Sequence, residues 1–310
     1  MLDPPGSIDF DILTMYSYYA YGLKILSEVK LPEFVESDPG SVDLEIRTIP
    51  IDSTSFHFPS ENPYYYSVDG TTFINVPSYA VFSIRQGREI VIALEEGVDP
   101  NRLHLYLTGN IFAFLLLQRS YLVLHASAAC VEGKAAAFLG MPGAGKSSMA
   151  AALYQSGHTI LVDDVTAVDL KTDPTSIVPA FPQIKLAIAA AESLGIDTRK
   201  LILLDEDEEK RGLRFTDRFL SANQPLSKIY ILTDQGDQPF QPISPQAAIL
   251  ELIRNSYPTR FAQAGGAEHF LQCSELAKNV PVFRLKKPKT AKDLTAFAAL
   301  LADHILSIST

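Results

Sequence analysis

A glycine-rich loop carries the residues best suited to chemistry. Residues 140–147 read G-M-P-G-A-G-K-S, which matches G-x-x-x-x-G-K-[ST]. Glycines let backbone amides approach phosphate oxygens, and a helix that begins near Gly145 directs the positive end of its dipole at the same anion. In this pattern Lys146 reaches the β- and γ-phosphates and the Ser147 hydroxyl binds Mg²⁺. The loop follows a predicted strand and precedes a predicted helix, which indicates a phosphate site rather than a surface turn.

The predicted nucleotide contacts all lie in this loop or directly after it. They are Gly140, Pro142, Gly143, Ala144, Gly145, Lys146, Ser147 and Ser148. The sequence does not reveal which nucleoside triphosphate they hold.

Two adjacent carboxylates follow the loop at short range. Residues 158–164, HTILVDD, predict a strand that ends in Asp163-Asp164. A carboxylate at a strand end beside a phosphate loop is the usual partner of Mg²⁺. We expect one of the two to bind the metal together with Ser147, and the other to accept a proton from an attacking hydroxyl. Alone, the pair would be read as a helix N-cap or a solvated turn. The nearby loop favours a catalytic role.

Residues 124–168 resemble the C-terminal domain of HPr kinase/phosphorylase. They are more similar to the HPr-kinase-related serine kinases, some of which belong to lasso-peptide and other ribosomal-peptide pathways. Four family features occur in order, namely His125, the loop, Gly157-His158 and Asp163-Asp164. The resemblance is looser from Ser221 onward. HPr kinase does not cover residues 1–100, although the peptide kinases also carry a β-rich segment there.

The resemblance implies an ATP- and Mg²⁺-dependent kinase that phosphorylates a serine of a peptide or protein, with a ribosomal precursor peptide as the expected acceptor. It implies that Lys146, Asp163 and Asp164 are catalytic and that His125 assists them. It does not divide the base and metal roles between the two aspartates. The signature rich in Glu, Arg and Gly that serves phosphorolysis and HPr binding is absent, since EEKRGLRF (208–215) is only faintly similar. HPr is therefore not the expected substrate.

Two other functions remain open at this stage. A small-molecule (metabolite) kinase would use the same loop and acids in a small closed pocket. A non-catalytic ATP-binding sensor would keep Lys146 but would not need a base. The two adjacent carboxylates favour a kinase, which needs a base, over a non-catalytic sensor.

The chain is predicted to be an α/β protein with a small β-rich domain over residues 1–100 and a catalytic domain over 101–310. By resemblance, the latter is a P-loop kinase domain of HPr-kinase/PEP-carboxykinase type. Residues 15–95 predict short, antiparallel strands, with turns at VDGT and RQGRE. A helix within 99–120 is expected to pack between the halves, and later helices are predicted around 244–257 and 290–308. The segment 195–225 is predicted to be irregular.

Composition limits the partners. The net charge of −10 argues against nucleic-acid binding, which requires a basic face. The two cysteines, Cys130 and Cys273, have no metal-site spacing and are expected to be reduced core residues. The N-terminal stretch has no basic region or long apolar run, so we expect no signal peptide or membrane contact and a cytoplasmic protein. Strand edges within 15–95 would accept an extended peptide or serve as an interface between copies of the chain.

Several basic residues are further candidates for contacting the transferred phosphate. They are Arg211, Arg214, Arg218, Lys228, Arg254 and Arg260. The sequence does not decide which of them assists, and it leaves the nucleotide preference, the number of phosphates added and the oligomeric state open.

Overall fold

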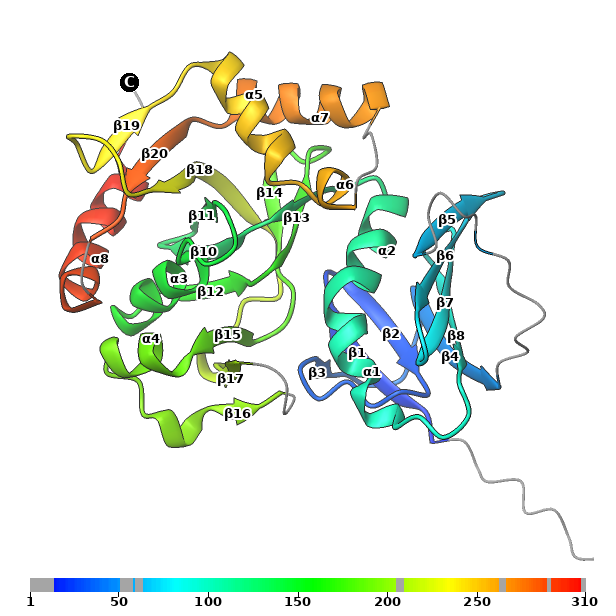
Figure 1. Ribbon diagram of the computed structural model, residues 1–310. Helices are drawn as coiled ribbons and strands as arrows, with labels where there is room; N and C mark the ends of the chain where they lie inside the picture. Colours follow the sequence, from blue (N-terminus) through cyan, green and yellow to red (C-terminus); the bar gives the residue numbers. More distant parts are fainter. Residues whose placement is uncertain are drawn as a thin grey trace, which may run out of the picture.

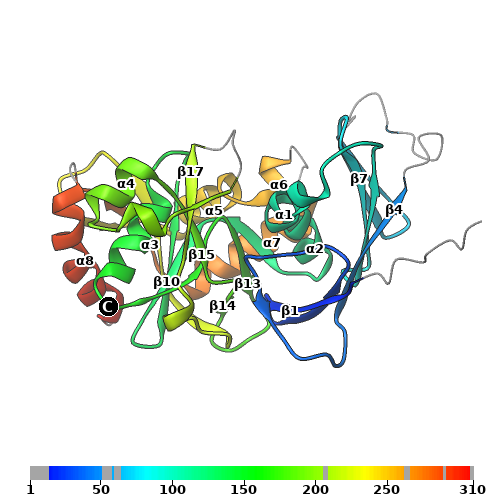
Figure 2. The ribbon, with the colours of Figure 1, turned by 90° about the horizontal axis from the view of Figure 1, so that it is seen from below.

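The computed structural model describes residues 14–50, 58, 64–204, 209–261, 266–288 and 291–307. It is a mixed α/β fold in which a β-rich N-terminal half and an α/β C-terminal half lie on either side of a helical segment (Figures 1 and 2). Residues 1–13, on which the expectation about a signal peptide partly rests, lie outside the described residues, as does the acidic stretch 205–208.

The N-terminal sheet has eight strands in the order β3-β1-β2-β4-β8-β7-β6-β5. Their bounds are β1 Tyr16–Ala20, β2 Leu23–Ser27, β3 Val35–Glu36, β4 Leu44–Pro50, β5 Tyr65–Val68, β6 Thr71–Val76, β7 Ala80–Arg85 and β8 Glu89–Leu94. The predicted strands and turns are confirmed, but the prediction of an antiparallel sheet is wrong in part. Strand β4 runs parallel to both β2 and β8, because the chain crosses over through β3 before β4 and through the three hairpin turns that join β5, β6, β7 and β8.

The helical segment links the two halves. It begins with a 3₁₀ turn, Pro100–Arg102, and continues through α1 (Leu103–Tyr106), a π-helical turn (Leu107–Ile111) and α2 (Phe112–Gln118). The fully buried ring of Phe112 stacks on Tyr21 of the N-terminal half at 5.6 Å between centroids. Helix α2 also packs on β9 (Leu122–His125) and β13 (Val165–Asp169) of the C-terminal half. The predicted helix between the halves is therefore confirmed.

The central sheet of the C-terminal half has nine strands. Besides β9 and β13 they are β10 Ser127–Val131, β11 Lys134–Leu139, β12 Thr159–Val162, β14 Ser176–Val178, β18 Gln224–Thr233, β19 Phe240–Pro242 and β20 Val282–Lys286. Strands β11, β18 and β20 run parallel as neighbours, so their carboxyl ends meet at one edge of the sheet. Strand β12, which precedes the aspartate pair, lies two places from β11 because β10 separates them.

Helices pack around the strands of the C-terminal half. They are α3 Lys146–Gln155, α4 Ile188–Ser193, α5 Pro245–Arg254, α6 Tyr257–Arg260, α7 Gly266–Asn279 and α8 Ala291–Leu306. Helix α3 is buried around most of its circumference and packs against α8 and β10, because its central residues are alanine, methionine and leucine. It ends at Gln155, and the turn that follows is closed by hydrogen bonds from the Gly157 and His158 amides to the Tyr154 and Leu153 carbonyls. These bonds place His158 in the turn that closes α3.

A second, three-stranded sheet in the C-terminal half corrects the prediction for 195–225. Its strands are β15 Gln183–Ala187, β16 Ile202–Leu203 and β17 Lys210–Arg214, in the order β15-β17-β16. Strand β17 lies in the stretch that was predicted to be irregular. Its charged residues interrupt the alternation of apolar and polar residues that predicts a strand, although Gly212 and Leu213 within it are buried.

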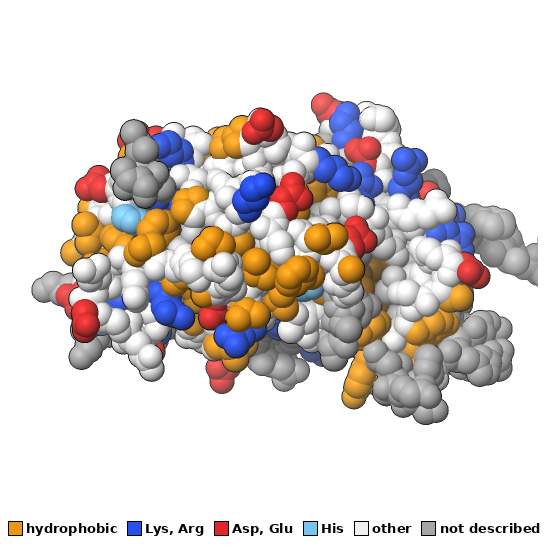
Figure 3. Space-filling model, turned by 90° about the horizontal axis from the view of Figure 1, so that it is seen from above, with side chains coloured by type: hydrophobic (Ala, Val, Ile, Leu, Met, Phe, Trp, Pro, Cys, Tyr) orange, Lys and Arg blue, Asp and Glu red, His pale blue; other side chains and the backbone are white. Residues whose placement is uncertain are grey.

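The two halves share one hydrophobic core. A single cluster of buried side chains runs from Tyr18 and Phe34 through Phe112 to Val123 and Phe181. The division at residue 100 into two domains stays a prediction. Within the described residues no helix is long and apolar enough to cross a membrane. The face formed by α5 and α7 exposes apolar side chains, among them Leu250, Phe270 and Leu271 (Figure 3).

Substitution of Phe112 tests this shared core. Phe112→Ala should lower the free energy of unfolding by about 3–5 kcal/mol, because it leaves a cavity beside Tyr21 and Phe34. Urea denaturation followed by circular dichroism measures the change. The matched control, Phe270→Ala at a side chain that is 52% exposed, should stay within about 0.5 kcal/mol of the original protein. Equal effects of the two substitutions would contradict the shared core.

Candidate active site

The glycine loop connects the end of β11 to the start of α3, as its sequence predicts. Gly143 and Gly145 have φ angles of 79° and 95°, a left-handed conformation that side chains disfavour. Gly145 is the N-cap of α3, so the loop presents its amides and the N-terminus of the helix to the same space. The loop therefore has the backbone form that a phosphate group requires.

Lys146 and Asn255 hold the start of the loop. The Lys146 ammonium donates to the Gly140 carbonyl at 2.9 Å, and the Gly140 amide donates to the Asn255 Oδ1 atom at 3.1 Å. Burial lowers the pKa of Lys146, and the nearby Asp164 and Asp163 partly offset this effect. An ammonium group has three donors, so Lys146 keeps donors for a phosphate while it contacts the loop.

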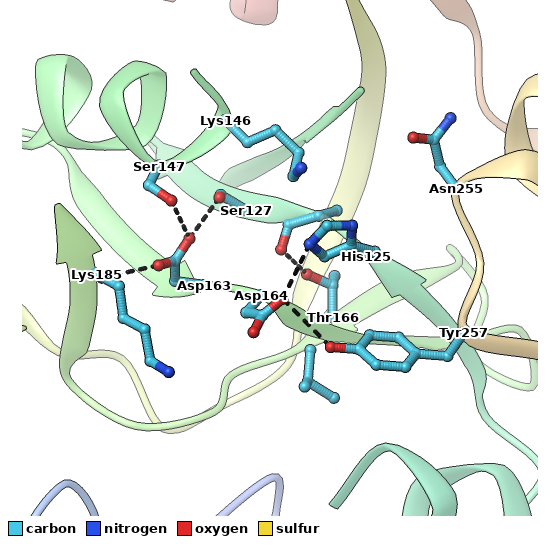
Figure 4. A network of polar contacts seen from close by, with 12 residues as sticks. His125, Ser127, Lys146, Ser147, Asp163, Asp164, Thr166, Lys185, Asn255 and Tyr257 are labelled. Carbon is cyan, nitrogen blue, oxygen red and sulfur yellow. Dashed lines mark hydrogen bonds and ion pairs between the residues drawn. The ribbon is translucent and has the colours of Figure 1, made fainter. Parts of the chain in front are cut away.

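Asp163 is buried at the base of the loop (Figure 4). Its Oδ1 atom accepts hydrogen bonds from Ser127 at 2.6 Å and from Ser147 at 2.8 Å, and its Oδ2 atom accepts one from the Lys185 amide at 2.9 Å. Burial raises the pKa of Asp163 above its usual value, although these hydrogen bonds oppose the shift. The structure thus brings the predicted metal ligands Ser147 and Asp163 into direct contact.

Asp164 lies in a different environment. Its Oδ1 atom is 3.1 Å from His125 Nε2 and accepts a hydrogen bond from the Tyr257 hydroxyl at 3.3 Å. Burial alone would raise the pKa of Asp164, but the hydrogen bond and charge of His125, together with Lys185 and Arg260, hold it well below the usual range. With a third of its side chain exposed, Asp164 stays ionised and open to the cavity described below.

A tight turn separates the two carboxylates. Asp164 has a φ of 74°, and the Val165 amide donates to the Asp163 carbonyl at 3.0 Å. This three-residue hydrogen bond with a positive φ at its centre has the form of a strained γ-turn. As a result, Asp163 points toward α3 and Asp164 toward β9 and α6 (Figure 4).

The loop and the acids open into one cavity of about 460 Å³. Three basic residues, Lys185, Lys210 and Arg260, line it together with His125 and the loop. Only Arg260 was among the sequence candidates. Lys185 lies on β15 and Lys210 at the start of β17, in the stretch that faintly resembles the HPr kinase signature. That faint resemblance was the available signal for Lys210, whereas Lys185 had none.

The other basic candidates lie elsewhere. Arg218 stacks on Tyr154, and Lys228 donates to backbone carbonyls at the end of α8. Arg254 pairs with Glu251 on the surface of α5. Arg211 and Arg214 also do not line the cavity. Sequence reasoning missed Ser127, Asn255 and Tyr257, whose polar atoms contact the loop and the acids only in the folded chain.

The donor set fits Mg²⁺. The Ser147 hydroxyl and the Asp163 carboxylate are hard oxygen ligands in contact with each other, and Mg²⁺ in nucleotide sites is typically held by one or two carboxylates plus phosphates and water. No cluster of three or more His, Cys, Asp or Glu side chains suited to a metal occurs among the described residues. A metal at this site would therefore depend on nucleotide oxygens for much of its coordination.

Comparisons with known proteins give a distant resemblance in fold. No protein-family model and no curated protein matches the chain. The structure of the Hpr(Ser) kinase/phosphatase from Coxiella burnetii aligns with 59% of this chain and 96% of its own, with 14% identical residues and a TM-score of 0.34.

The loop contact of Asn255 gives a first test of the site. Asn255→Ala should weaken the binding of Mg·ATP about tenfold, because the Gly140 amide loses its acceptor and the loop loses its fixed form. Isothermal titration calorimetry measures the dissociation constant. The control Asn223→Ala, at an asparagine outside the cavity, should leave it unchanged. An unchanged constant in Asn255→Ala would contradict a positioning role for this side chain.

Protonation of Asp163 gives a second test. Because burial raises the pKa of Asp163, this group should take up a proton at a higher pH than an exposed aspartate does, and binding of Mg·ATP should displace that proton. Calorimetry over a series of acidic pH values, in buffers of different ionisation enthalpy, should detect proton release that Asp163→Asn abolishes. Affinity should accordingly fall as the pH is lowered through the raised pKa. The same proton release in the variant would assign it to another group.

Proposed function

We propose that this protein is an ATP- and Mg²⁺-dependent kinase that transfers the γ-phosphoryl group to a serine hydroxyl of a peptide or protein. One observation carries the proposal. The phosphate loop with Lys146 and the separated carboxylates of Asp163 and Asp164 meet in one cavity. A loop that held a nucleotide without chemistry would not require an ionised carboxylate facing the cavity.

The charge of the cavity supports the same function. Lys146, Lys185, Lys210 and Arg260 line it, against the two carboxylates of Asp163 and Asp164. The excess of positive charge complements the net negative charge that a nucleoside triphosphate retains after it binds one divalent cation. The chain as a whole has a net charge of −10, so this basic lining is a local feature.

Each residue has a defined part in the proposed transfer. The amides of the loop and Lys146 bind the phosphates, and Ser147 with Asp163 would hold Mg²⁺. When bound, the metal would offset charge on the phosphoryl oxygens. Asp164 orients the acceptor hydroxyl and takes its proton, while His125 and Tyr257 fix the direction of the carboxylate. Arg260 and Lys185 stabilise the negative charge on the oxygens of the transferring phosphoryl group.

The low pKa of Asp164 is compatible with this role. Phosphoryl transfer passes through a loose transition state, in which the hydroxyl needs orientation more than early deprotonation. Because the Asp164 carboxylate stays ionised, it accepts a hydrogen bond from the acceptor hydroxyl without first having to lose a proton. We propose a ribosomal precursor peptide as the acceptor, which rests on the sequence resemblance over residues 124–168.

Replacement of Asp164 tests the proposed function. Asp164→Asn should lower the rate of phosphate transfer by about 10²–10⁴-fold, because the acceptor hydroxyl loses its proton acceptor, while the dissociation constant of Mg·ATP changes by less than about threefold. The measurement is incubation with γ-labelled ATP and a library of serine-containing peptides, read by mass shift. Lys146→Ala should abolish transfer, whereas the surface control Asp303→Asn should transfer at the original rate.

Other outcomes identify the alternatives. Consumption of free serine or another small alcohol without any peptide would show a metabolite kinase. Binding of ATP without transfer to any acceptor, unaffected by Asp163→Asn and Asp164→Asn, would show a sensor.

A further inference from the structure

A second cavity lies beside the glycine loop. Its volume is about 440 Å³, and it is lined by the loop residues Met141, Pro142, Gly143 and Ala144, by residues 232–235 and by Lys287. Pro142 and Gly143 also line the cavity that contains the acids. The two cavities are therefore adjacent, and the loop forms a wall of each.

The position of the γ-phosphate fixes one end of a bound triphosphate. The γ-phosphate must lie near Lys146, Asp163 and Asp164, all of which line the first cavity. That cavity has the size of a site for one drug-sized ligand, and the acceptor side chain must enter it as well. The nucleoside thus has more room on the other side of the loop.

The topology points to the same place. Strands β11, β18 and β20 are parallel neighbours, and ligands of α/β sheets bind beyond the carboxyl ends of parallel strands. The loop follows β11, Thr233–Gln235 close and follow β18, and Lys287 directly follows β20. The second cavity is formed by these three strand ends.

The lining has the chemistry of a nucleoside site. Met141 is 77% exposed, although it lies in a loop of otherwise small residues, and Leu232 forms a buried apolar wall. A thioether sulfur makes favourable contacts with an aromatic ring. The Asp234 carboxylate and the Gln235 amide lie at the rim, where they would meet the polar edge of a base.

Lys287 joins this cavity to the loop. Its ammonium donates to the Ala144 carbonyl at 3.2 Å and lies 3.4 Å from the Asp234 carboxylate. It is thus placed between the phosphate loop and the rim, where the ribose and the α-phosphate of a nucleotide would lie.

We propose that the second cavity binds the nucleoside of a purine nucleoside triphosphate, with the base against Met141 and its polar edge toward Asp234 and Gln235. This proposal rests on the proposed kinase function, because it takes the phosphate positions from it. Adenine and guanine both carry N–H donors on their polar edge, so Asp234 accepts from either. We therefore expect ATP and GTP to bind with similar affinity, and pyrimidine nucleotides to bind more weakly because their single ring offers Met141 less apolar surface.

Tripolyphosphate separates the nucleoside contribution from the phosphate contribution. The double variant Met141→Ala, Asp234→Asn should raise the dissociation constant of Mg·ATP about tenfold and leave that of magnesium tripolyphosphate within about twofold. Titration calorimetry on the full chain measures both. Because neither side chain is buried, folding should be unaffected, and circular dichroism checks this.

The matched control addresses the other location for the base. Ala190→Phe enlarges a residue of α4 that lines only the first cavity. It should change the affinities for Mg·ATP and for magnesium tripolyphosphate by the same factor, whereas it would weaken the binding of Mg·ATP alone if the base lay against α4. Loss of tripolyphosphate binding in the double variant would also overturn the proposal, because the substitutions would then act through the loop.

Photolabelling locates the base directly. After irradiation with 8-azido-ATP, the label should map to peptides that contain Met141 or residues 233–235. Labelling of residues 186–190 instead would overturn the nucleoside site but leave the kinase function intact. Failure of the original protein to bind tripolyphosphate, or binding that Lys146→Ala does not alter, would overturn the kinase function itself.

Discussion

The turn at Asp164 is the constraint on which the site depends. Two carboxylates that are adjacent in sequence would repel each other if both faced one point, and one of them would lose its charge. The positive φ of Asp164 directs the side chains to different partners. Asp163 is buried against the two serine hydroxyls, and Asp164 lies against His125 and Tyr257. Backbone strain of this kind persists only where surrounding structure enforces it, and here the Ala126 amide, which donates to the Asp164 carbonyl, helps to hold the turn.

One short segment holds the loop, His125 and Asp164 in position relative to one another. Residues 255–257, which run from the end of α5 to the first residue of α6, contact the loop, His125 and Asp164. The Asn255 side chain accepts from the loop at Gly140, its carbonyl accepts from the His125 amide at 2.7 Å, and Tyr257 donates to Asp164. The Ser256 hydroxyl between them is anchored to His269 of α7 at 2.8 Å. The relative positions of loop, histidine and acid are thus set by one connection rather than by three independent elements.

The sequence predicts the local parts of this site better than their assembly. The loop, α3 and the strand before Asp163 follow from glycine spacing and apolar periodicity, which are properties of neighbouring residues. The parallel pairing of β4 and the strand β17 were missed, because pairing with distant strands and burial on one face decide them. Lys185, Asn255 and Tyr257 were missed for a related reason. Each is an ordinary residue in its own segment, and only the fold brings it to the cavity.

The contact between the N-terminal sheet and α6 has a consequence for how an acceptor is used. Tyr65 of β5 donates to the Phe261 carbonyl at 2.6 Å, and Phe261 stacks on Phe114 of α2 at 4.0 Å between centroids. Phe261 directly follows Arg260, so the N-terminal half supports the segment that carries this cation. In the proposed kinase, an acceptor that contacted the N-terminal sheet would therefore act on the segment that carries Arg260, the cation assigned to the transferring phosphoryl group. In the proposed kinase, binding energy from contacts far from the reacting hydroxyl would then raise kcat rather than lower the Kd of the acceptor.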